Sequence, residues 1–439
     1  MEVFAVLILA CAGVTLLLRS PVGFMLAVTL QLSLRAIGLF RLSTEDLARP
    51  STAWFFALSI VAMALGYFSA VAISSSSQRR RPIVTAQKKV RVLPNGAVWG
   101  IVLVSGGLSL YHLVAIGIPL FSSSIETSRF DFTSSGFFGI PGRMYLFGVN
   151  IAWIVASANA HLLGHKWRSY GPWRWATGFL VLTSLLSGFK GELLVLVVTI
   201  VALYCIITGS VLKLGTVAKR YWWAAAAPIA YFVSVAGLYS TYAASSSSIV
   251  VQLIERTTIV SAEPTQYAME GRVSMTGNAL LNDFFYFIAK YTGQTPPGAF
   301  TFERAVSASI LNVPPASSAW APPVTIGGFA ELSFTFGIPG ALLGMYLCGM
   351  LFARLERIER VSTVGISLSA VVALALYSWI LKGGLAYNFV NFAAVVVMLA
   401  LVGLACAPFG NRSKVTPDQR HYPHQPHRTA STNTQKSID

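Results

Sequence analysis

A polar segment from residue 243 to residue 331 carries the side chains of this chain that are best suited to chemistry. Its candidate carboxylates and arginines are spread over most of its length: Glu270, Asp283, Glu331, Arg256, Arg272 and Arg304. A positioned carboxylate is a common general base. An arginine binds phosphate groups through paired hydrogen bonds. These residue types therefore predict transfer of a group from an anionic donor to a hydroxyl acceptor.

Three further cations lie near this segment in the predicted topology although they are distant in sequence: Arg143, Lys190 and Lys382. Lys190 belongs to the turn Ser187–Glu192, whose glycines permit a sharp reversal between two apolar runs. A cation on such a short hairpin cannot move far from the membrane interface. We therefore expect Lys190 to hold an anionic head group, although a simple Lys190–Glu192 ion pair is the alternative.

The elements that must position these side chains are membrane helices. The chain has 439 residues, of which 55% are hydrophobic and only 11% are charged. A membrane-spanning helix needs about 20 apolar residues, and about eleven runs satisfy this length. We predict an all-α polytopic membrane protein with helices in residues 1–242 and 332–407, an extracytoplasmic loop at 243–331 and a disordered cytoplasmic tail at 408–439.

The formal charge of +16 has an uneven distribution along the chain. Most of the lysines and arginines fall in alternate loops, among them the runs at 79–91 and 354–360 and the C-terminal tail. This segregation is the positive-inside pattern of membrane proteins. It predicts that the basic loops are cytoplasmic and that residues 243–331 face the opposite side. The basic charge is thus a topology signal and does not indicate nucleic-acid binding.

The segment also contains local signals for its own structure. Three apolar patches, Ile249–Val260, Ala279–Ile288 and Phe302–Leu311, are typical of amphipathic helices on a membrane surface. The proline and glycine residues at 314–328 predict a bent backbone before Glu331, which begins an apolar helix. Three roles for Glu331 remain open: a helix cap, the partner of an arginine, or a base.

Two polar residues lie inside predicted spans. Arg35 is close to the outer end of its span and can either anchor the helix at the interface or serve a function. His112 lies toward the outer side of another span, where hydrogen bonding within the bundle is favoured over a functional role.

The stretch Pro323–Gly344 resembles a segment of bacterial O-antigen polymerases, also called oligosaccharide repeat-unit polymerases. In that family a proline precedes a Gly-Glu pair, an aromatic turn, Phe-Gly and a glycine-spaced helix; the acid corresponds to Glu331, with Ala330 in place of the glycine. The turn Ser187–Gly191 resembles the family's Ser-Gly-x-Arg-Gly turn, with Lys190 in the arginine position. The number of spans and the single large outer loop are also similar.

The resemblance implies a membrane glycosyltransferase that builds O-antigen, capsular polysaccharide or exopolysaccharide at the outer face of the bacterial inner membrane. Its substrate would be a polyprenyl-diphosphate-linked oligosaccharide, and its partners a chain-length regulator and export proteins. The cations would bind the diphosphate, and Glu331, Glu270 or Asp283 would be the base. We expect no cofactor, and without an Asp-x-Asp motif nothing requires a metal.

Three other functions remain open from the sequence. An O-antigen ligase would use the same donor but a different acceptor. A transporter or flippase of lipid-linked oligosaccharides should place charges along a central path through the membrane. The predicted spans are nearly free of charge, which favours an enzyme over a transporter. A non-catalytic scaffold of an export complex is the third alternative.

Overall fold

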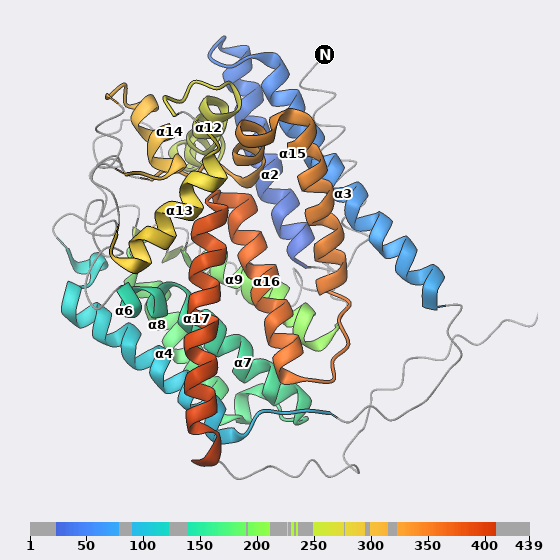
Figure 1. Ribbon diagram of the computed structural model, residues 1–439, viewed down its shortest axis with the longest axis vertical. Coiled ribbons are helices and arrows are strands. Elements are labelled where there is room, and N and C mark those ends of the chain that lie inside the picture. The colour runs from blue at the N-terminus through green and yellow to red at the C-terminus, as the bar shows by residue number, and fades with distance from the viewer. Residues whose placement is uncertain are drawn as a thin grey trace, which may run out of the picture.

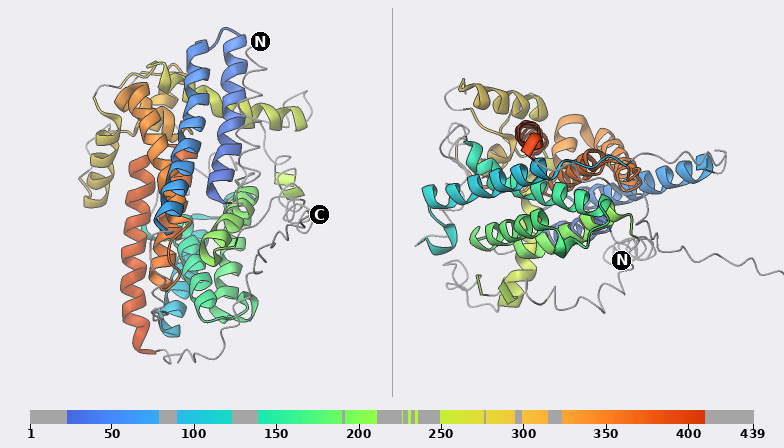
Figure 2. Two further views of the ribbon diagram at one scale, coloured as in Figure 1. Left: turned by 90° about the vertical axis from the view of Figure 1, so that its right-hand side faces the viewer. Right: turned by 90° about the horizontal axis from the view of Figure 1, so that it is seen from below.

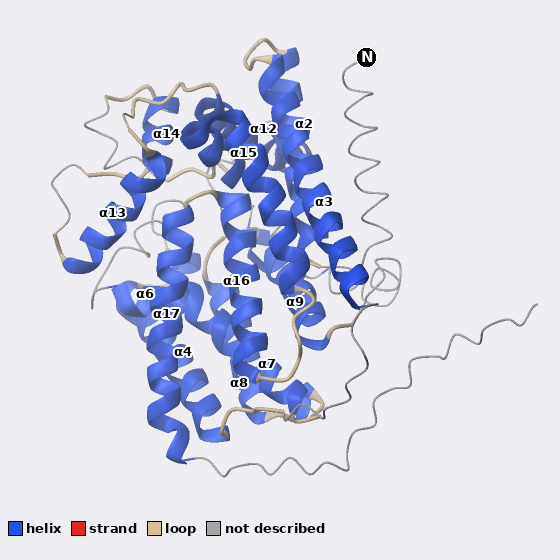
Figure 3. Ribbon diagram, turned by 45° about the vertical axis from the view of Figure 1, so that its right-hand side comes forward, coloured by secondary structure: helices blue, strands red, loops and turns tan. Residues whose placement is uncertain are grey.

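The computed structural model describes residues 23–78, 90–122, 139–189, 192–210, a few single residues between 226 and 235, and residues 249–275, 277–294, 299–314 and 323–409. Every named element in these ranges is a helix (Figure 3). Four predicted features lie outside, or almost entirely outside, the described residues: the spans at 3–18 and 222–242, the hairpin residue Lys190 and the C-terminal tail. The all-α prediction is confirmed.

Six helices in the described part of the chain are long and apolar enough to cross a membrane. They begin with α2 (Phe24–Thr44), α3 (Pro50–Gln78) and α4 (Asn95–Ile116), which leads into the short η1 (Pro119–Phe121). They end with α15 (Gly328–Leu355), α16 (Thr363–Lys382) and α17 (Leu385–Cys406), which leads into η6 (Ala407–Phe409). Helix length and hydropathy thus identify a multi-pass membrane protein.

The remaining predicted spans form shorter helices. A continuous helical stretch contains α6 (Ile140–Arg143), the π-helical turn η3 (Met144–Gly148) and α7 (Val149–Leu162). After η4 (Trp167–Ser169) come α8 (Gly171–Leu186) and α9 (Glu192–Thr208). At 16 and 17 residues, α8 and α9 fall below the length of about 20 residues that a bilayer requires. The expected total of eleven spans therefore stays a prediction.

The polar segment forms three helices at one end of the molecule, beside the loop that joins α2 to α3 (Figure 1). They are α12 (Ile249–Met269), α13 (Ala279–Thr292) and α14 (Phe302–Ile310). The predicted helices at 279–288 and 302–311 are confirmed closely. The first helix continues past the predicted end at Val260, through Pro264, because Ala262, Thr265 and Ala268 are buried against the bundle.

Glycines allow two helix pairs to pack with their backbones in contact. A Cβ atom at Gly349 of α15 would overlap the carbonyl oxygen of Met63 in α3, and one at Gly66 of α3 would overlap that of Tyr346 in α15. Gly38 of α2 lies in the same way against Thr258 of α12. Such small residues are the usual means by which membrane helices approach closely. The packing fixes α15 and α12 onto the first helical pair.

The α15 helix is bent at Gly337, beyond residues 314–328, where the sequence predicted a bent backbone. Gly337 has φ 70° and ψ 174° within the helix, and Pro339 follows it. A positive φ favours glycine because a Cβ atom is strained there. The bend separates a first arm, residues 328–336, from the long second arm that runs beside α3. The two views in Figure 2 show this bundle from the side and along its length.

Candidate functional site

Glu331 lies fully buried in the first arm of α15 and binds the turn between α16 and α17. Its Oε2 accepts a hydrogen bond of 2.8 Å from Trp379 Nε1. The backbone N–H of Leu385 donates to both carboxylate oxygens, at 3.1 and 3.2 Å. This turn contains Gly383 and Gly384, both with positive φ. Among the described residues Glu331 has no ion pair, so its present contacts hold the turn in place.

Glu303, in the first turn of α14, approaches the same α16–α17 turn from another direction. A Cβ atom at Gly384 would overlap its Oε1 atom. The side chain is half-buried and has no hydrogen bond or ion pair to any residue that the structure describes. Burial, followed by the charges of Glu331 and Asp283, raises the pKa of Glu303 well above its ordinary value. The sequence offers Glu303 as one of five available bases of the polar segment, with Glu255, Glu270, Asp283 and Glu331, but does not place it among the preferred three.

Asp283 connects α13 to the start of α14 and is 1% exposed. Its Oδ1 accepts hydrogen bonds from the backbone N–H of Phe302 at 2.9 Å and from Asn282 Nδ2 at 3.2 Å. Its Oδ2 is buried and has no partner within the described ranges. Burial raises the pKa of Asp283 to about 6, against the opposing effect of these hydrogen bonds. Asp283 therefore caps α14 and still has one unused acceptor.

Two cations, Arg304 and Lys382, lie beside these carboxylates, and two more, Arg143 and Lys290, lie near Arg304 or one another. The Arg143 Nε atom, at the end of α6, donates to Asn391 Oδ1 of α17 at 2.9 Å. Desolvation, followed by the charges of Arg143 and Arg304, lowers the pKa of Lys290 in α13. Arg304 and Lys382 also interact with Glu303 through their charges. Four helices outside α15 thus contribute cations to one region.

We call this group the turn cluster, because it surrounds the α16–α17 turn. It consists of Asp283, Glu303, Glu331, Arg143, Lys290, Arg304 and Lys382. The amino groups of Lys290 and Lys382 have no hydrogen bond or ion pair to the residues described here. Among the described side chains, no group of His, Cys, Asp and Glu forms a metal-binding set. The cluster can bind an anionic group through its cations and transfer a proton through its acids.

Arg35 supports the same turn from α2. Its Nη2 atom donates to the Leu381 carbonyl oxygen at 2.7 Å, and the residue is 6% exposed. Its Nη1 atom lies against Gly327 and is buried without a partner in the described part of the chain. The sequence left two roles open for Arg35, anchoring of its helix at the interface and a function. The observed hydrogen bond joins Arg35 to the backbone of α16 and not to the lipid interface.

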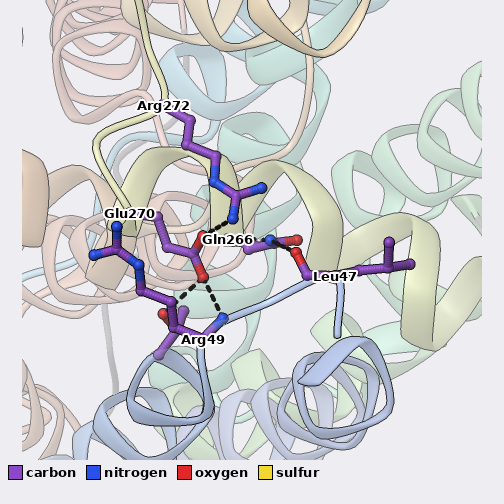
Figure 4. Close-up of polar contacts among 6 residues, drawn as sticks. Leu47, Arg49, Gln266, Glu270 and Arg272 are labelled. Atoms are coloured by element: carbon purple, nitrogen blue, oxygen red, sulfur yellow. Dashed lines mark hydrogen bonds and ion pairs between the residues drawn. The ribbon is translucent and has the colours of Figure 1, made fainter. Parts of the chain in front are cut away.

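The structure separates Glu270 and Arg272 from the turn cluster. Glu270 Oε1 accepts from the Arg49 backbone N–H at 2.7 Å and from Thr52 Oγ1 at 3.0 Å (Figure 4). Its Oε2 forms an ion pair of 2.7 Å with Arg272. These contacts join the end of α12 to the start of α3, and Gln266 adds a hydrogen bond to the Leu47 carbonyl oxygen. No member of the turn cluster is among these partners.

The other predicted site residues cannot be placed with the cluster. Lys190 lies outside the described residues. Arg256 belongs to α12, but its side chain is also outside them.

An apolar groove lies between α13 and α17, next to the turn cluster. Its volume is about 550 Å³, and it is lined by Leu280, Leu281, Phe284, Leu385, Ala386, Phe389, Val390 and Ala393. Two of the lining residues connect it to the cluster, since Phe284 follows Asp283 in sequence and the N–H of Leu385 binds Glu331. Leu281 and Phe284 are also strongly exposed. The site therefore combines the charged turn cluster with an apolar groove.

The sequence-based predictions did not include several residues of this site. Trp379, Asn388 and Asn391 hold the turn or a cluster cation, and all three are buried. Asn388 and Asn391 are polar residues three apart in an otherwise apolar helix, a spacing that puts them on one face. That signal was available in the sequence.

Comparisons with protein-family models, with curated proteins and with solved structures find no match for this chain.

Proposed function

We propose that this protein polymerises polyprenyl-diphosphate-linked oligosaccharide repeat units at the outer face of the bacterial inner membrane. The observation that carries the proposal is the apolar groove between α13 and α17 that ends at the turn cluster. A lipid-linked sugar diphosphate needs this combination: an apolar channel for the isoprenoid chain and cations for the diphosphate. The sequence resemblance to O-antigen polymerases supports the same substrate independently of the groove.

The cations would act on the leaving group of this reaction. Negative charge grows on the lipid diphosphate as the sugar is transferred to the acceptor hydroxyl. Preorganised cations at a site shielded from water stabilise such charge strongly. Lys290 suits this role because its pKa is lowered by desolvation and then by the charges of Arg143 and Arg304, and a bound anion would relieve that repulsion between cations. Lys190, at the basic position of the family turn, is the further cation that we expect to contact the diphosphate.

The placement of charge favours an enzyme over a transporter. Three acids of the described residues, Asp283, Glu303 and Glu331, meet in the turn cluster at one end of the bundle, whereas Glu356, at the opposite end of α15, accepts a hydrogen bond from Tyr67. A transporter is expected to place its polar binding residues near the middle of the membrane. The same chemistry fits an O-antigen ligase, which differs in the acceptor.

Glycan length analysis in a strain that lacks this chain tests the proposal. Accumulation of single repeat units would identify a polymerase, whereas accumulation of long unligated polymer would identify a ligase. Restoration of polymer by the wild-type chain, and not by an inactive variant, assigns the effect to this protein. Wild-type glycan in the deletion strain would contradict both activities.

The orientation can be measured separately. Single cysteine substitutions at Ser247 and Ser76 should react with a membrane-impermeant reagent only at Ser247, because the positive-inside pattern puts residues 79–91 in the cytoplasm. The reverse labelling pattern would place the turn cluster on the cytoplasmic side and exclude an outer-face polymerase.

A further inference from the structure

Two glutamates contact the α16–α17 turn in different ways. Both oxygens of Glu331 are used by donors from Trp379 and Leu385. Glu303 touches Gly384 of the same turn, but it uses neither oxygen for a hydrogen bond within the described part of the chain. It is also half-buried, whereas Glu331 is completely enclosed. A substrate hydroxyl can therefore reach Glu303 without breaking existing hydrogen bonds.

The other two sequence-based candidates, Glu270 and Asp283, are less available to a substrate. Glu270 is occupied by Arg49, Thr52 and Arg272. Asp283 is 1% exposed and uses one oxygen to cap α14. This cap places Glu303, two residues after the N-cap Thr301, at the start of the helix and next to Arg304. Asp283 thus determines where the Glu303 side chain begins.

We infer that Glu303 is the residue that accepts the proton of the acceptor hydroxyl, and that Glu331 is a positioning residue that holds the α16–α17 turn against it. The inference rests on the proposed polymerase function and assigns the base of that reaction. It reverses the order of the sequence-based candidates, in which Glu331 came first.

The groups that face Glu303 come from four helices. Asp283 of α13 and Glu331 of α15 are acidic, whereas Arg304 of α14 itself and Lys382 of α16 are basic. Burial and the two acids raise the pKa of Glu303, and the two cations oppose this effect. A carboxylate that binds its proton more tightly than usual is a stronger base for a hydroxyl group. The wild-type rate should therefore rise with pH through a value above the ordinary carboxyl range.

The step balances with the groups already named. The acceptor O–H bond breaks, and its proton moves to the Glu303 carboxylate. The acceptor oxygen forms a bond to the anomeric carbon of the donor sugar, while the bond from that carbon to the diphosphate oxygen breaks. The electron pair of that bond stays on the diphosphate beside Lys290 and Arg304. The proton then leaves Glu303 for water or the released diphosphate.

The test uses the full chain in lipid nanodiscs, with the lipid-linked repeat unit extracted from a strain that lacks this protein. Glu303→Gln should lower kcat by about 10²–10⁴-fold with little change in KM, because general-base help is lost while binding remains. It should also flatten the rise of kcat with pH. Glu303→Asp should recover part of the rate. Glu45→Gln is the matched control, since Glu45 is 45% exposed in a surface pair with Arg41.

Glu331→Gln separates positioning from proton transfer. It should lower the rate but keep a rise of kcat with pH, because Glu303 is still present; this rise should move to lower pH, since the charge of Glu331 no longer raises the pKa of Glu303. If Glu331→Gln flattens the pH profile and Glu303→Gln does not, the assignment is overturned.

Infrared spectroscopy gives a readout that needs no substrate. The carbonyl stretches of Glu303 and Asp283 should both titrate above the ordinary carboxyl range in the wild type, and Glu303→Gln should remove one component of that band. An unchanged band overturns the inference.

If the wild type does not polymerise the repeat unit, the proposed function fails. If the wild type polymerises it and Glu303→Gln is equally fast with the same pH profile, only the inference about Glu303 fails.

Discussion

Two polar groups at opposite ends of the helical bundle differ in how completely they are hydrogen-bonded. At one end, Asn159 of α7 forms four hydrogen bonds. Its Oδ1 atom accepts from the Leu93 backbone N–H at 2.9 Å and from Thr363 Oγ1 at 2.8 Å. Its Nδ2 atom donates to the Leu93 carbonyl oxygen and to Tyr170 Oη. Tyr170 in turn donates to Asn95. We call this group the Asn159 network. At the other end, the turn cluster leaves polar atoms of Asp283, Glu303 and Lys290 without such partners among the described residues.

The cations show the same contrast. Arg360, near the Asn159 network, donates to the backbone carbonyl oxygens of Ile206, Ile358 and Glu356. Lys290 and Lys382 have no hydrogen bond or ion pair in the part of the chain that the structure describes. Both lysines are exposed, so their amino groups remain available to an anionic ligand. The comparison therefore separates the structural Asn159 network from the candidate catalytic turn cluster.

The largest effect on activity outside the Glu303 series is expected for Lys290→Gln. Loss of a cation that stabilises the leaving diphosphate should lower kcat by about 10²–10³-fold, the usual cost of removing one preorganised donor. The matched control is Lys166→Gln, which removes an exposed cation at the other end of the bundle and should leave activity at the wild-type level. Single-turnover measurements with the lipid-linked repeat unit check both. Equal activity of the two variants would remove Lys290 from the site.

The largest effect on stability is expected for Asn159→Ala. The change leaves the backbone N–H and carbonyl oxygen of Leu93 and the Thr363 hydroxyl without their Asn159 partner, and each such group costs about 1–3 kcal/mol. We expect a total loss of about 3–5 kcal/mol in the free energy of unfolding, measured by denaturant titration in micelles. Activity per folded molecule should not change. Inactive but fully stable protein would contradict the division between the two ends.

Asp283 should make stability depend on pH. Its pKa is raised from 3.8 to about 6 by burial, so the folded state keeps a proton that the unfolded state releases between these values. Stability should therefore fall as pH rises from about 4 to about 6, by about 3 kcal/mol for this residue, and then level off. Asp283→Asn should show a smaller slope in that range. A slope identical to that of the wild type would show that Asp283 titrates normally.

The smallest effect is expected at the exposed pair of Arg41 and Glu45. Their side chains are 49% and 45% exposed and form an ion pair of 3.0 Å one helical turn apart. Such pairs contribute about 0–1 kcal/mol. Glu45→Gln should therefore change the unfolding free energy by less than about 1 kcal/mol, and raising the salt concentration should remove the difference. A larger loss would mean that this loop contributes to the site end beyond its contact with Glu270.

The contacts of Glu270 show why residue type alone could not decide which of the candidate carboxylates is the base. Glu270, Asp283 and Glu331 are all acids of the polar segment, and the sequence treats them alike. Their environments differ because partners come from distant parts of the chain. Arg49 and Thr52, which bind Glu270, precede it by more than 200 residues, and the packing of α12 on α2 brings them together.

The amino-acid sequence by itself determined the properties that depend on local composition. Apolar runs predicted the long helices, and amphipathic patches predicted α13 and α14. Only the tertiary structure decided which charges meet. Asp283, Glu303 and Glu331 share the α16–α17 turn because α13, α14 and the first arm of α15 pack around it. Helical periodicity and hydropathy are set by neighbouring residues, whereas the partner of a buried charge depends on how separate helices pack.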